Sequence, residues 1–387
     1  MKIGILTYHR AINYGAFLQA YGLCQRLNEE TDIEAEVIDF QMKKEYGSYF
    51  HYNYDHFPRI RHLLWSIKHH KTWCFKKKLI SSFERGLKKM PLSDNYLISD
   101  SVDEFQDFVK GKYDFIIVGS DEVWKIDGFR GFPTPYWLPG NLECGKLSYA
   151  ASSRNDFSKL DEKINNSVRE YLEDFLYISV RDELTKANFY NYVGYKGSID
   201  ILPDPSFVYD YKPDGLRGRN LLSQRVGIDP CNKIMVVMIG HQNISVAAQI
   251  KKELEDDYQL VAVYSYQNSY CNLSDLDPFE WLDVIAGADF VCASYFHAIC
   301  FSIICQVPFL AFNLDNKLNK VLPVLSQSGN NNRWIDIDEK LYEDGYLRAR
   351  IEELSCPCNG QDYVKFNRQK FDEYISVIRQ LIKNHKR

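Results

Sequence analysis

The sequence predicts an α/β protein made of two domains, each with a mostly parallel sheet covered by helices on both faces. Its 387 residues are too many for one ordinary core and suit two domains of about 150–200 residues each. Short apolar segments alternate with segments of helical periodicity in both halves of the chain, which is typical of βαβ units. Two such Rossmann-like domains in tandem create a cleft at the carboxyl ends of their strands, where folds of this kind bind ligands.

The first predicted domain spans residues 1–205. Its opening apolar segment runs into an Asn-Tyr-Gly turn and a helix over 16–27, which together begin a βαβ unit. An insertion over 41–110 interrupts the alternation of strands and helices before it resumes. The strands that we expect in this domain lie at residues 2–8, 36–40, 113–119, 146–151, 175–180 and 198–202.

The second predicted domain spans residues 206–387 and begins with a polar, glycine-containing segment over 209–232 that is typical of a linker. Helices are expected over 281–286 and 297–305. The tail 361–387 carries apolar residues at helical spacing, so we expect it to close the structure as a helix. The strands that we expect in this domain lie at residues 233–239, 259–264, 289–293 and 308–312.

Within the insertion, residues 56–90 form a basic and aromatic segment, with ten Lys and Arg against one acid, Glu84. Trp65 and Trp73 are interleaved with the basic residues. As an interfacial amphipathic element, this segment would hold the protein peripherally against the anionic lipid at the inner face of the membrane. The alternative is a solvated pair of surface helices with both tryptophans packed inward.

Composition and charge exclude several classes of function. The net charge of −5 provides no global field to attract nucleic acid, and no stretch reaches the ~18–20 uninterrupted apolar residues of a membrane-spanning helix. The start of the chain carries no signal-peptide pattern and the ten cysteines are scattered, so we expect a reduced, cytoplasmic protein. Cys356 and Cys358 are the only close pair, and the sequence therefore predicts neither a metal site nor a cofactor.

Polar residues that directly follow predicted strands are the first candidates for ligand binding. Asn13, Tyr14 and Gly15 form a turn between a strand and a helix, where backbone N–H groups can hold an anion or a hydroxyl. An ordinary turn between a strand and a helix is the alternative interpretation of these three residues.

A second polar group follows the predicted strand over 113–119. Ser120, Asp121 and Glu122 place two carboxylates and a hydroxyl at a strand end, where they can accept protons from sugar hydroxyls. The same three residues are equally typical of a helix N-cap with acidic residues in the first turn.

Two further candidates, Arg181 and His297, also lie at predicted strand ends. Arg181 follows a buried-looking strand, a position that suits a guanidinium clamping phosphate or carboxylate; an ion pair with Asp182, Glu183 or another nearby acid is the alternative. His297 follows Ser294 by one turn and lies at a junction between a strand and a helix. A histidine beside apolar residues is often structural, but this junction faces the predicted cleft.

Six segments occur in this order along the chain: NYGAFLQAYGL, DFIIVGSDEVW, LSYAASS, ISVRDE, DPSFV and DFVCASYFHAICFSIICQVPFLAF. Together they resemble the bacterial polysaccharide pyruvyl transferases over about residues 1–335. The resemblance implies a fold like that of the two-domain GT-B glycosyltransferases. It also implies transfer of the enolpyruvyl carbons of phosphoenolpyruvate to two hydroxyls of a sugar, giving a cyclic ketal and phosphate during the assembly of capsule, exopolysaccharide or cell-wall polymer.

The resemblance also implies roles for particular residues. Asp121 would be the catalytic base, and His297 would donate a proton or steady the departing phosphate. The remaining roles are binding of the donor phosphoenolpyruvate and of a sugar or lipid-linked oligosaccharide acceptor. The donor-binding residues would be Arg181, His297, Ser294 and Arg333, and the acceptor-binding residues Asn13, Tyr14, Gly15, Ser120 and Glu122.

The sequence departs from the family pattern at several positions. Glu122 stands where the family commonly has Gln, Lys125 where it has Asn, and Ala298 where Gly is frequent. Tyr295 stands where some members carry Arg. Another cation would then have to serve the donor, and the candidates are Arg333, Lys125 and Arg154.

Two rival functions stay open. A GT-B glycosyltransferase that uses a nucleotide sugar would share the fold and would bind a nucleoside diphosphate through its C-terminal half. A non-catalytic sugar-binding protein would have kept the fold and lost the donor site, and the absence of an arginine at position 295 is the argument for it. Fold alone does not decide among these functions.

Overall fold

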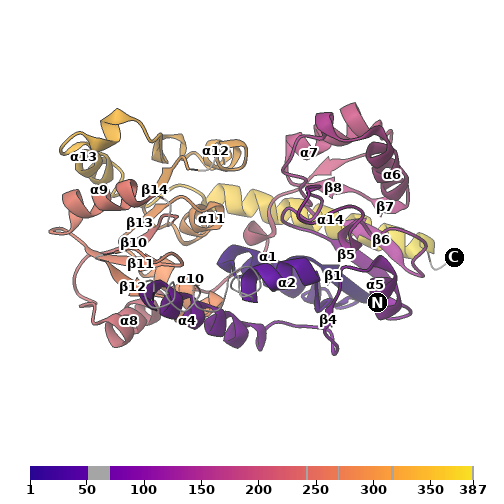
Figure 1. The fold of residues 1–387 in the computed structure, drawn as a ribbon, viewed down its shortest axis with the longest axis horizontal. Coiled ribbons are helices and arrows are strands. Elements are labelled where there is room, and N and C mark those ends of the chain that lie inside the picture. The colour runs from indigo at the N-terminus through magenta and orange to yellow at the C-terminus, as the bar shows by residue number, and fades with distance from the viewer. Residues whose placement is uncertain (51–69, 241–242, 269, 315–317, 386–387) are drawn as a thin grey trace, which may run out of the picture. The chain divides into compact units, whose positions relative to one another are not determined.

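The computed structural model describes residues 1–50, 70–240, 243–268, 270–314 and 318–385. The described residues form two compact units. Unit 1 contains residues 1–50, 89–210 and 366–385, and unit 2 contains residues 70–88 and 211–365 with the gaps just given. Figure 1 shows the ribbon, in which each unit is built around a parallel sheet.

Unit 1 is organised by a five-stranded parallel sheet in the order β2-β1-β5-β6-β7. β1 pairs with both β2 and β5, so the first strand of the chain lies in the interior of the sheet. β1, β5 and β7 are short, largely apolar segments, as expected for a sheet covered on both faces, whereas β2 carries two glutamates and β6 a lysine and a serine. The strands are β1 Lys2–Leu6, β2 Glu34–Val37, β5 Phe115–Val118, β6 Gly145–Ser148 and β7 Phe175–Tyr177.

Two small parallel pairs and six helices complete unit 1. The pairs are β3 Phe40–Gln41 with β4 Leu97–Ile98, and β8 Ser179–Val180 with β9 Asp200–Ile201. The helices are α1 Tyr14–Asn28, α2 Lys43–Phe50, α5 Val102–Val109, α6 Glu162–Glu173, α7 Glu183–Asn188 and most of α14 Gln361–His385.

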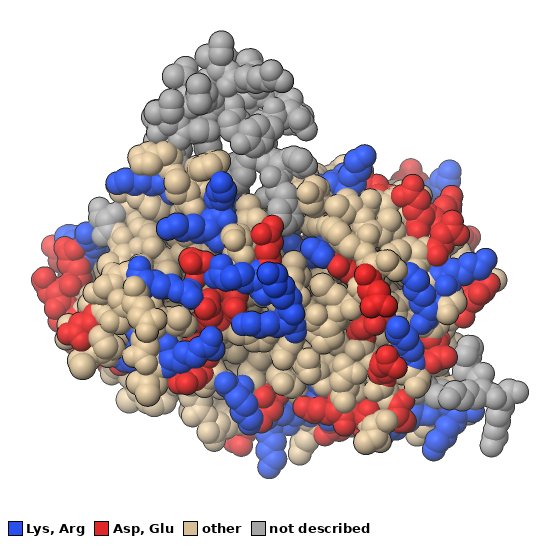
Figure 2. All heavy atoms as spheres, turned by 90° about the horizontal axis from the view of Figure 1, so that it is seen from below, with Lys and Arg blue, Asp and Glu red and all other residues tan. Residues whose placement is uncertain are grey.

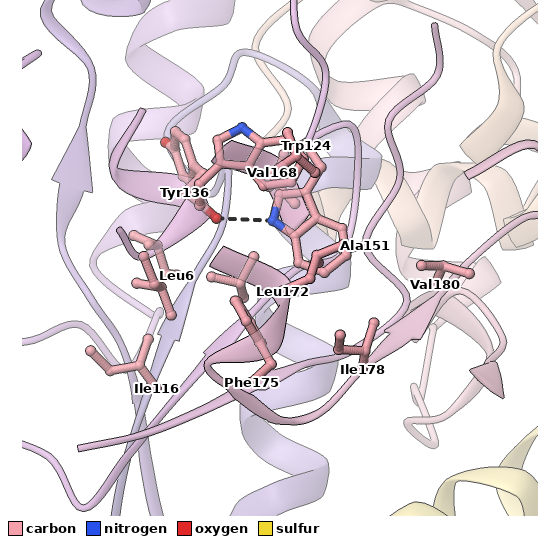
Figure 3. Close-up of a cluster of buried hydrophobic side chains, with 14 of the residues drawn as sticks. Leu6, Ile116, Trp124, Tyr136, Ala151, Val168, Leu172, Phe175, Ile178 and Val180 are labelled. Carbon is pink, nitrogen blue, oxygen red and sulfur yellow. Dashed lines mark hydrogen bonds between the residues drawn. The ribbon is translucent and has the colours of Figure 1, made fainter. Parts of the chain in front are cut away.

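The core of unit 1 contains Trp124, which is fully buried. Its indole stacks on Trp137 with ring centroids 5.4 Å apart, and its Nε1 donates to the carbonyl of Tyr136 at 3.1 Å. Figure 3 shows this bond and the apolar side chains around it, including Leu172 and Phe175. The packed indole fixes the loop that follows β5, which carries the candidate site described below.

Unit 2 is organised by a six-stranded parallel sheet in the order β12-β11-β10-β13-β14-β15. Its strands are β10 Ile234–Met238, β11 Gln259–Val263, β12 Cys271–Leu273, β13 Phe290–Ala293, β14 Phe309–Phe312 and β15 Trp334–Ile335. Its helices are α4 His70–Leu87, α8 Gly215–Val226, α9 Ile244–Leu254, α10 Pro278–Ala286, α11 Phe296–Cys305, α12 Leu318–Gln327 and α13 Tyr346–Glu353.

The segment 209–232 is more than a linker, because it contains helix α8. This helix packs against α10 at very short range. A Cβ atom added at Gly218 would lie 2.0 Å from the carbonyl oxygen of Asp283. The glycine is therefore required for the close approach of the two helices, and the prediction of a plain linker is corrected.

Helix α4 belongs to unit 2, although the sequence places it inside the first predicted domain. Its apolar residues Phe75, Leu79 and Phe83 are buried, and the helix packs against α10. Arg85 forms an ion pair with Asp275 at 2.7 Å. The described part of the basic, aromatic segment is thus a helix whose apolar face packs on unit 2, while Trp65 lies outside the described residues.

Helix α14 contributes to unit 1 from residue 366 onward, whereas the sequence assigned it to the second domain. Phe371 and Tyr374 pack on Tyr149, which follows β6, with ring centroids 5.3 and 4.9 Å apart. Arg379 adds an ion pair with Glu30 at 2.7 Å. Figure 1 shows the yellow helix beside β6. The apolar face of α14 therefore completes the core of unit 1.

Surface charge is of mixed sign. On the face seen in Figure 2, Lys and Arg side chains are interspersed with Asp and Glu, in keeping with the net charge of −5. Across the described residues, no helix combines the length and the apolar content that crossing a bilayer requires.

Candidate functional site

The carboxyl ends of the unit 1 strands carry a cluster of polar residues on strained backbone. Asp121, Ala150 and Arg154 follow β5 and β6, and all three adopt left-handed φ angles, of 74°, 48° and 59°. Non-glycine residues rarely occupy this region, and when they do they gather at functional sites. The strand-end residues of unit 1 are therefore the strongest candidate site in that unit.

Arg181 lies between two carboxylates in this cluster. Its Nη1 donates to Asp204 Oδ2 at 3.0 Å, and its Nη2 lies 3.8 Å from Asp121 Oδ1. Its side chain is only 7% exposed. Burial alone lowers the pKa of Arg181, but the negative charges of Asp204 and Asp121 outweigh it and raise the pKa above the ordinary value. The guanidinium is thus a permanent, buried cation beside Asp121.

Ser120 is buried and held from three sides. Its hydroxyl donates to the carbonyl of Ala150 at 2.8 Å, and its own carbonyl accepts from the Thr7 hydroxyl at 3.1 Å. The amide of Gln19 lies 3.5 Å from the Ser120 hydroxyl and also contacts Asp204. Sequence reasoning missed Gln19, which is a polar side chain on the buried face of a helix.

The predicted acceptor residues at the start of α1 have structural partners. Asn13 is the N-cap of the helix, and its Oδ1 accepts from the backbone N–H groups of Gly15 at 3.0 Å and Ala16 at 3.3 Å. Tyr14 and Gly15 are buried. The side-chain oxygen of Asn13 therefore caps the helix, and the role of the three residues in acceptor binding stays a prediction.

Glu122 and Arg154 form an ion pair at the rim of the cluster. The two oxygens of Glu122 lie 3.2 and 3.0 Å from Arg154 Nη1. Lys125 is paired with Asp127 at 2.7 Å. Both candidate replacement cations in unit 1 thus have acidic partners of their own.

A second polar cluster next to Asp121 was not foreseen from the sequence. Glu45 is 7% exposed and lies 3.3 Å from the Nε of Arg130. Arg130 also donates to the carbonyl of Glu122 at 3.0 Å and covers the ring of Tyr8. Burial raises the pKa of Glu45 to about 7, although the charge of Arg130 opposes the shift. Asp121 lies close enough to raise the pKa of Glu45 further.

The raised pKa of Glu45 predicts a pH-dependent stability. The pKa of this carboxyl is about 7 in the folded protein and about 4.5 in the unfolded chain. As the pH rises above 4.5, the unfolded chain loses this proton more readily than the folded protein does, so the folded protein becomes less stable. We expect this residue to lower the free energy of unfolding by about 2–3 kcal/mol between pH 5 and pH 8. Denaturant unfolding at several pH values should show this slope in the wild type and a smaller slope in Glu45→Gln. Equal slopes in the two proteins would contradict the assignment.

In unit 2, His297 and Ser294 lie where β13 ends and α11 begins. Ser294 is 3% exposed, and its backbone N–H donates to the carbonyl of Met238 at 3.0 Å, which joins the ends of β13 and β10. His297 is 9% exposed and lies in the first turn of α11. The structure thus brings these two predicted residues to one strand end.

Tyr295 contacts two residues that directly follow β11, Tyr264 and Ser265. Its ring meets that of Tyr264 edge to face, with centroids 4.9 Å apart, and its hydroxyl lies 3.0 Å from that of Ser265. Tyr264 has a left-handed φ of 73°. Strained backbone therefore marks a strand end in unit 2 as well as in unit 1.

Arg333 does not join His297 and Ser294. Its guanidinium donates to the carbonyls of Leu354 at 2.9 Å and Cys356 at 2.8 Å, and to that of Phe309 at 3.3 Å. Phe309 is the first residue of β14, so these bonds lie at the amino end of the strand, away from the end where His297 lies. Arg333 thus satisfies buried carbonyls in this structure, and its role in donor binding stays a prediction.

Each unit thus gathers its own candidate residues. Unit 1 brings together Ser120, Asp121, Glu122 and Arg181, and unit 2 brings together Ser294 and His297. Within the described part of the chain, no three His, Cys, Asp or Glu side chains are arranged to hold a metal ion.

Solved structures with a similar fold include UDP-GlcNAc 2-epimerase from Methanocaldococcus jannaschii. It aligns with a TM-score of 0.54 at 13% identity, over 92% of this chain and 93% of that chain. A structure of the Methanocaldococcus jannaschii enzyme with UDP-GlcNAc and UDP has a TM-score of 0.51 at 11% identity, over 99% of this chain and 100% of that one. A putative UDP-N-acetylglucosamine 2-epimerase from Listeria monocytogenes has a TM-score of 0.51 at 10% identity, over 99% and 97%. At such low identity these matches show the fold alone, which is the GT-B-like pair of Rossmann-like domains.

Sequence comparison identifies the family. A search of curated proteins finds no match to this chain. The family model described as polysaccharide pyruvyl transferase matches residues 13–316, which include Asn13, Asp121, Arg181 and His297. This range covers most of the 387 residues and both candidate strand-end clusters. The chain therefore belongs to the polysaccharide pyruvyl transferase family, a family of transferases.

Proposed function

We propose that this protein transfers pyruvate from phosphoenolpyruvate to two hydroxyls of a sugar, forming a cyclic ketal and releasing phosphate during assembly of a bacterial surface polysaccharide. The observation that carries the proposal is the pairing of the partly exposed Asp121 carboxylate with the buried Arg181 guanidinium at strained strand ends, in a chain that belongs to the pyruvyl transferase family. The acceptor, free or lipid-linked, is a sugar that presents two hydroxyls close enough to close one ketal ring.

The chemistry requires a proton acceptor for the sugar. An acceptor hydroxyl loses its proton as its oxygen attacks the carbon that bears phosphate in the donor. Asp121 is the proposed base, because its carboxylate is 18% exposed and has the buried guanidinium of Arg181 beside it. Arg181 is also the proposed ligand of an anionic group of the donor, since guanidinium binds carboxylate and phosphate well.

The donor requires a proton source and a place for the leaving phosphate. The methylene carbon of phosphoenolpyruvate gains a proton when the hydroxyl oxygen adds to its neighbour. The bond from that neighbouring carbon to the phosphate oxygen then breaks as the second hydroxyl closes the ketal, and the proton of the second hydroxyl leaves with the phosphate. His297 and Ser294 are the proposed donor-side residues, since a helix N-terminus favours a departing anion. His297 either donates the proton or steadies the phosphate.

Ligand-dependent thermal stability tests this proposal. Phosphoenolpyruvate at 100 times its dissociation constant should stabilise the protein by about 2.7 kcal/mol, which gives a measurable rise in melting temperature. We expect this rise in the wild type and in Arg85→Ala, a surface arginine of α4, and its loss in Arg181→Ala. Phosphate release should then be assayed with phosphoenolpyruvate and galactose, glucose, mannose or N-acetylglucosamine.

The other outcomes favour the rival functions. A rise in melting temperature with UDP or GDP but not with phosphoenolpyruvate would replace the proposal with a nucleotide-sugar glycosyltransferase. A rise with a sugar alone, without phosphate release, would support a sugar-binding protein that lacks transfer activity.

A further inference from the structure

The buried amide of Gln19 links two loops of the unit 1 site. Gln19 lies on α1 and is 2% exposed. Its Nε2 donates to Asp204 Oδ2 at 2.5 Å and lies 3.5 Å from the hydroxyl of Ser120. One side chain therefore ties the helix to the loop after β5 and to the loop after β9.

Asp204 is held at both carboxylate oxygens. Its Oδ2 accepts from Gln19 and also from Arg181 Nη1, at 3.0 Å. Its Oδ1 accepts from the backbone N–H of Ser206 at 3.0 Å. Because both oxygens have fixed partners, the carboxylate cannot rotate without breaking one of these bonds. The direction of the Arg181 guanidinium is fixed in turn.

Arg181 extends this chain of contacts to Asp121. One end of its guanidinium is bound to Asp204, and the other end, Nη2, lies 3.8 Å from Asp121 Oδ1. An arginine side chain has many rotamers, and an ion pair of defined geometry removes most of them. The contacts thus run from α1 through Asp204 and Arg181 to the proposed base.

Gln19 carries a cost that a purely structural residue would avoid. Its Oε1 is buried and has no hydrogen-bond partner among the described residues. An unpaired buried oxygen destabilises the folded state, and an apolar side chain at this position would remove that penalty. We therefore attribute the role of this side chain to its amide N–H group, which donates to Asp204.

We propose that Gln19 and Asp204 are positioning residues, which fix the guanidinium of Arg181 against Asp121. The effect of these two residues on catalysis rests on the proposed function, whereas the contacts by which they hold Arg181 do not. By holding Arg181, they keep a positive charge beside the carboxylate that accepts the sugar proton and beside the anionic donor. Neither residue takes part in proton transfer.

The test compares Gln19→Met with a matched control. Methionine has nearly the length of glutamine but no amide donor. The control is Gln249→Met, because Gln249 of α9 is also buried and also donates to a carboxylate, Glu253, at 2.5 Å. The first readout is the side-chain ¹⁵N spectrum of Arg181, assigned with Arg181→Lys. The second is the affinity for phosphoenolpyruvate and the kcat of phosphate release with the best hexose acceptor.

We expect the control to leave Arg181 rigid and the kinetics unchanged. In Gln19→Met the separate Nη signals of Arg181 should merge as the guanidinium begins to rotate, and kcat should fall roughly 10- to 100-fold, as for a catalytic group displaced by about 1 Å. Asp204→Asn should produce the same changes where the protein folds. Unchanged Arg181 signals in Gln19→Met, with kcat within about twofold of the wild type, would overturn the proposal.

The design separates this inference from the proposed function. If Arg181 gains mobility in Gln19→Met while the wild type neither binds phosphoenolpyruvate nor releases phosphate, the positioning role stands and the pyruvyl transfer fails. If the wild type is active and Gln19→Met loses only melting temperature, to the same extent as Gln249→Met, Gln19 is structural.

Discussion

Replacing Asp121 with asparagine is expected to lower kcat for pyruvyl transfer by about 10²–10⁴-fold, the usual loss when a general base is removed. Asparagine keeps the shape of the side chain but cannot take the proton of a sugar hydroxyl. The measurement is phosphate release with saturating phosphoenolpyruvate and the best hexose acceptor.

The fold should survive this substitution for two reasons. Asp121 has a φ of 74°, and asparagine is one of the few residues that tolerate this region. Arg181 also keeps its partner Asp204, so no buried charge is left unpaired. Melting temperature and phosphoenolpyruvate binding should therefore stay near the wild-type values. Wild-type kcat in Asp121→Asn would remove Asp121 from the mechanism.

Trp124→Ala is expected to lower the free energy of unfolding by about 3–5 kcal/mol, through the cavity that it leaves in a packed core. The indole contacts Trp137, Phe175 and Phe189, with ring centroids 5.4, 5.7 and 5.4 Å away. Denaturant unfolding followed by circular dichroism measures the loss.

Phenylalanine substitutions at the two stacked tryptophans separate packing from hydrogen bonding. Trp124→Phe removes a bond to the Tyr136 carbonyl, whereas the Nε1 of Trp137 is buried with no hydrogen-bond partner among the described residues. Trp137→Phe should thus be less destabilising than Trp124→Phe, since it deletes an unsatisfied donor. The opposite order would show that shape, rather than hydrogen bonding, decides the energetics of this pair.

The main strands were predictable because parallel strands buried on both faces are continuous apolar segments. The segments 113–119, 233–239 and 289–293 contain β5, β10 and β13. β12 and β15 were missed, because strands of three and two residues leave no pattern in the sequence. Their positions depend on backbone pairing with β11 and β14, which the side-chain pattern of so few residues does not reveal.

The assignment of α4 and α14 to their units was not predictable from periodicity. Each helix has an apolar face, which indicates that the helix packs against a core. The pattern does not indicate which of the two sheets that core belongs to. The partners are aromatic residues far away in the sequence, such as Tyr266 for Phe75 and Tyr149 for Phe371. The sequence prediction assigned each helix to the domain next to it along the chain, whereas α4 belongs to unit 2 and most of α14 to unit 1.

Parts of the candidate site could be found from the rule that ligands bind at carboxyl strand ends. Asp121, Arg181 and His297 all lie there. Arg333 was chosen for its charge, and its burial against carbonyls at the other end of β14 depends on contacts that charge does not reveal. Glu45 and Gln19 lie on helices, where a polar residue on an otherwise apolar face was the only signal available.

Helix α14 constrains how this protein folds during its synthesis. The ribosome completes the sheet of unit 1 at β7, but Tyr149 receives Phe371 and Tyr374 only after the intervening residues of unit 2 have been made. The nascent unit 1 therefore holds an uncovered apolar surface while about 150 residues are added, which takes on the order of ten seconds or more at 5–20 residues per second. Exposed apolar surface of this kind favours aggregation and binding by chaperones. A chain that stops before residue 366 would lack the part of α14 that covers Tyr149.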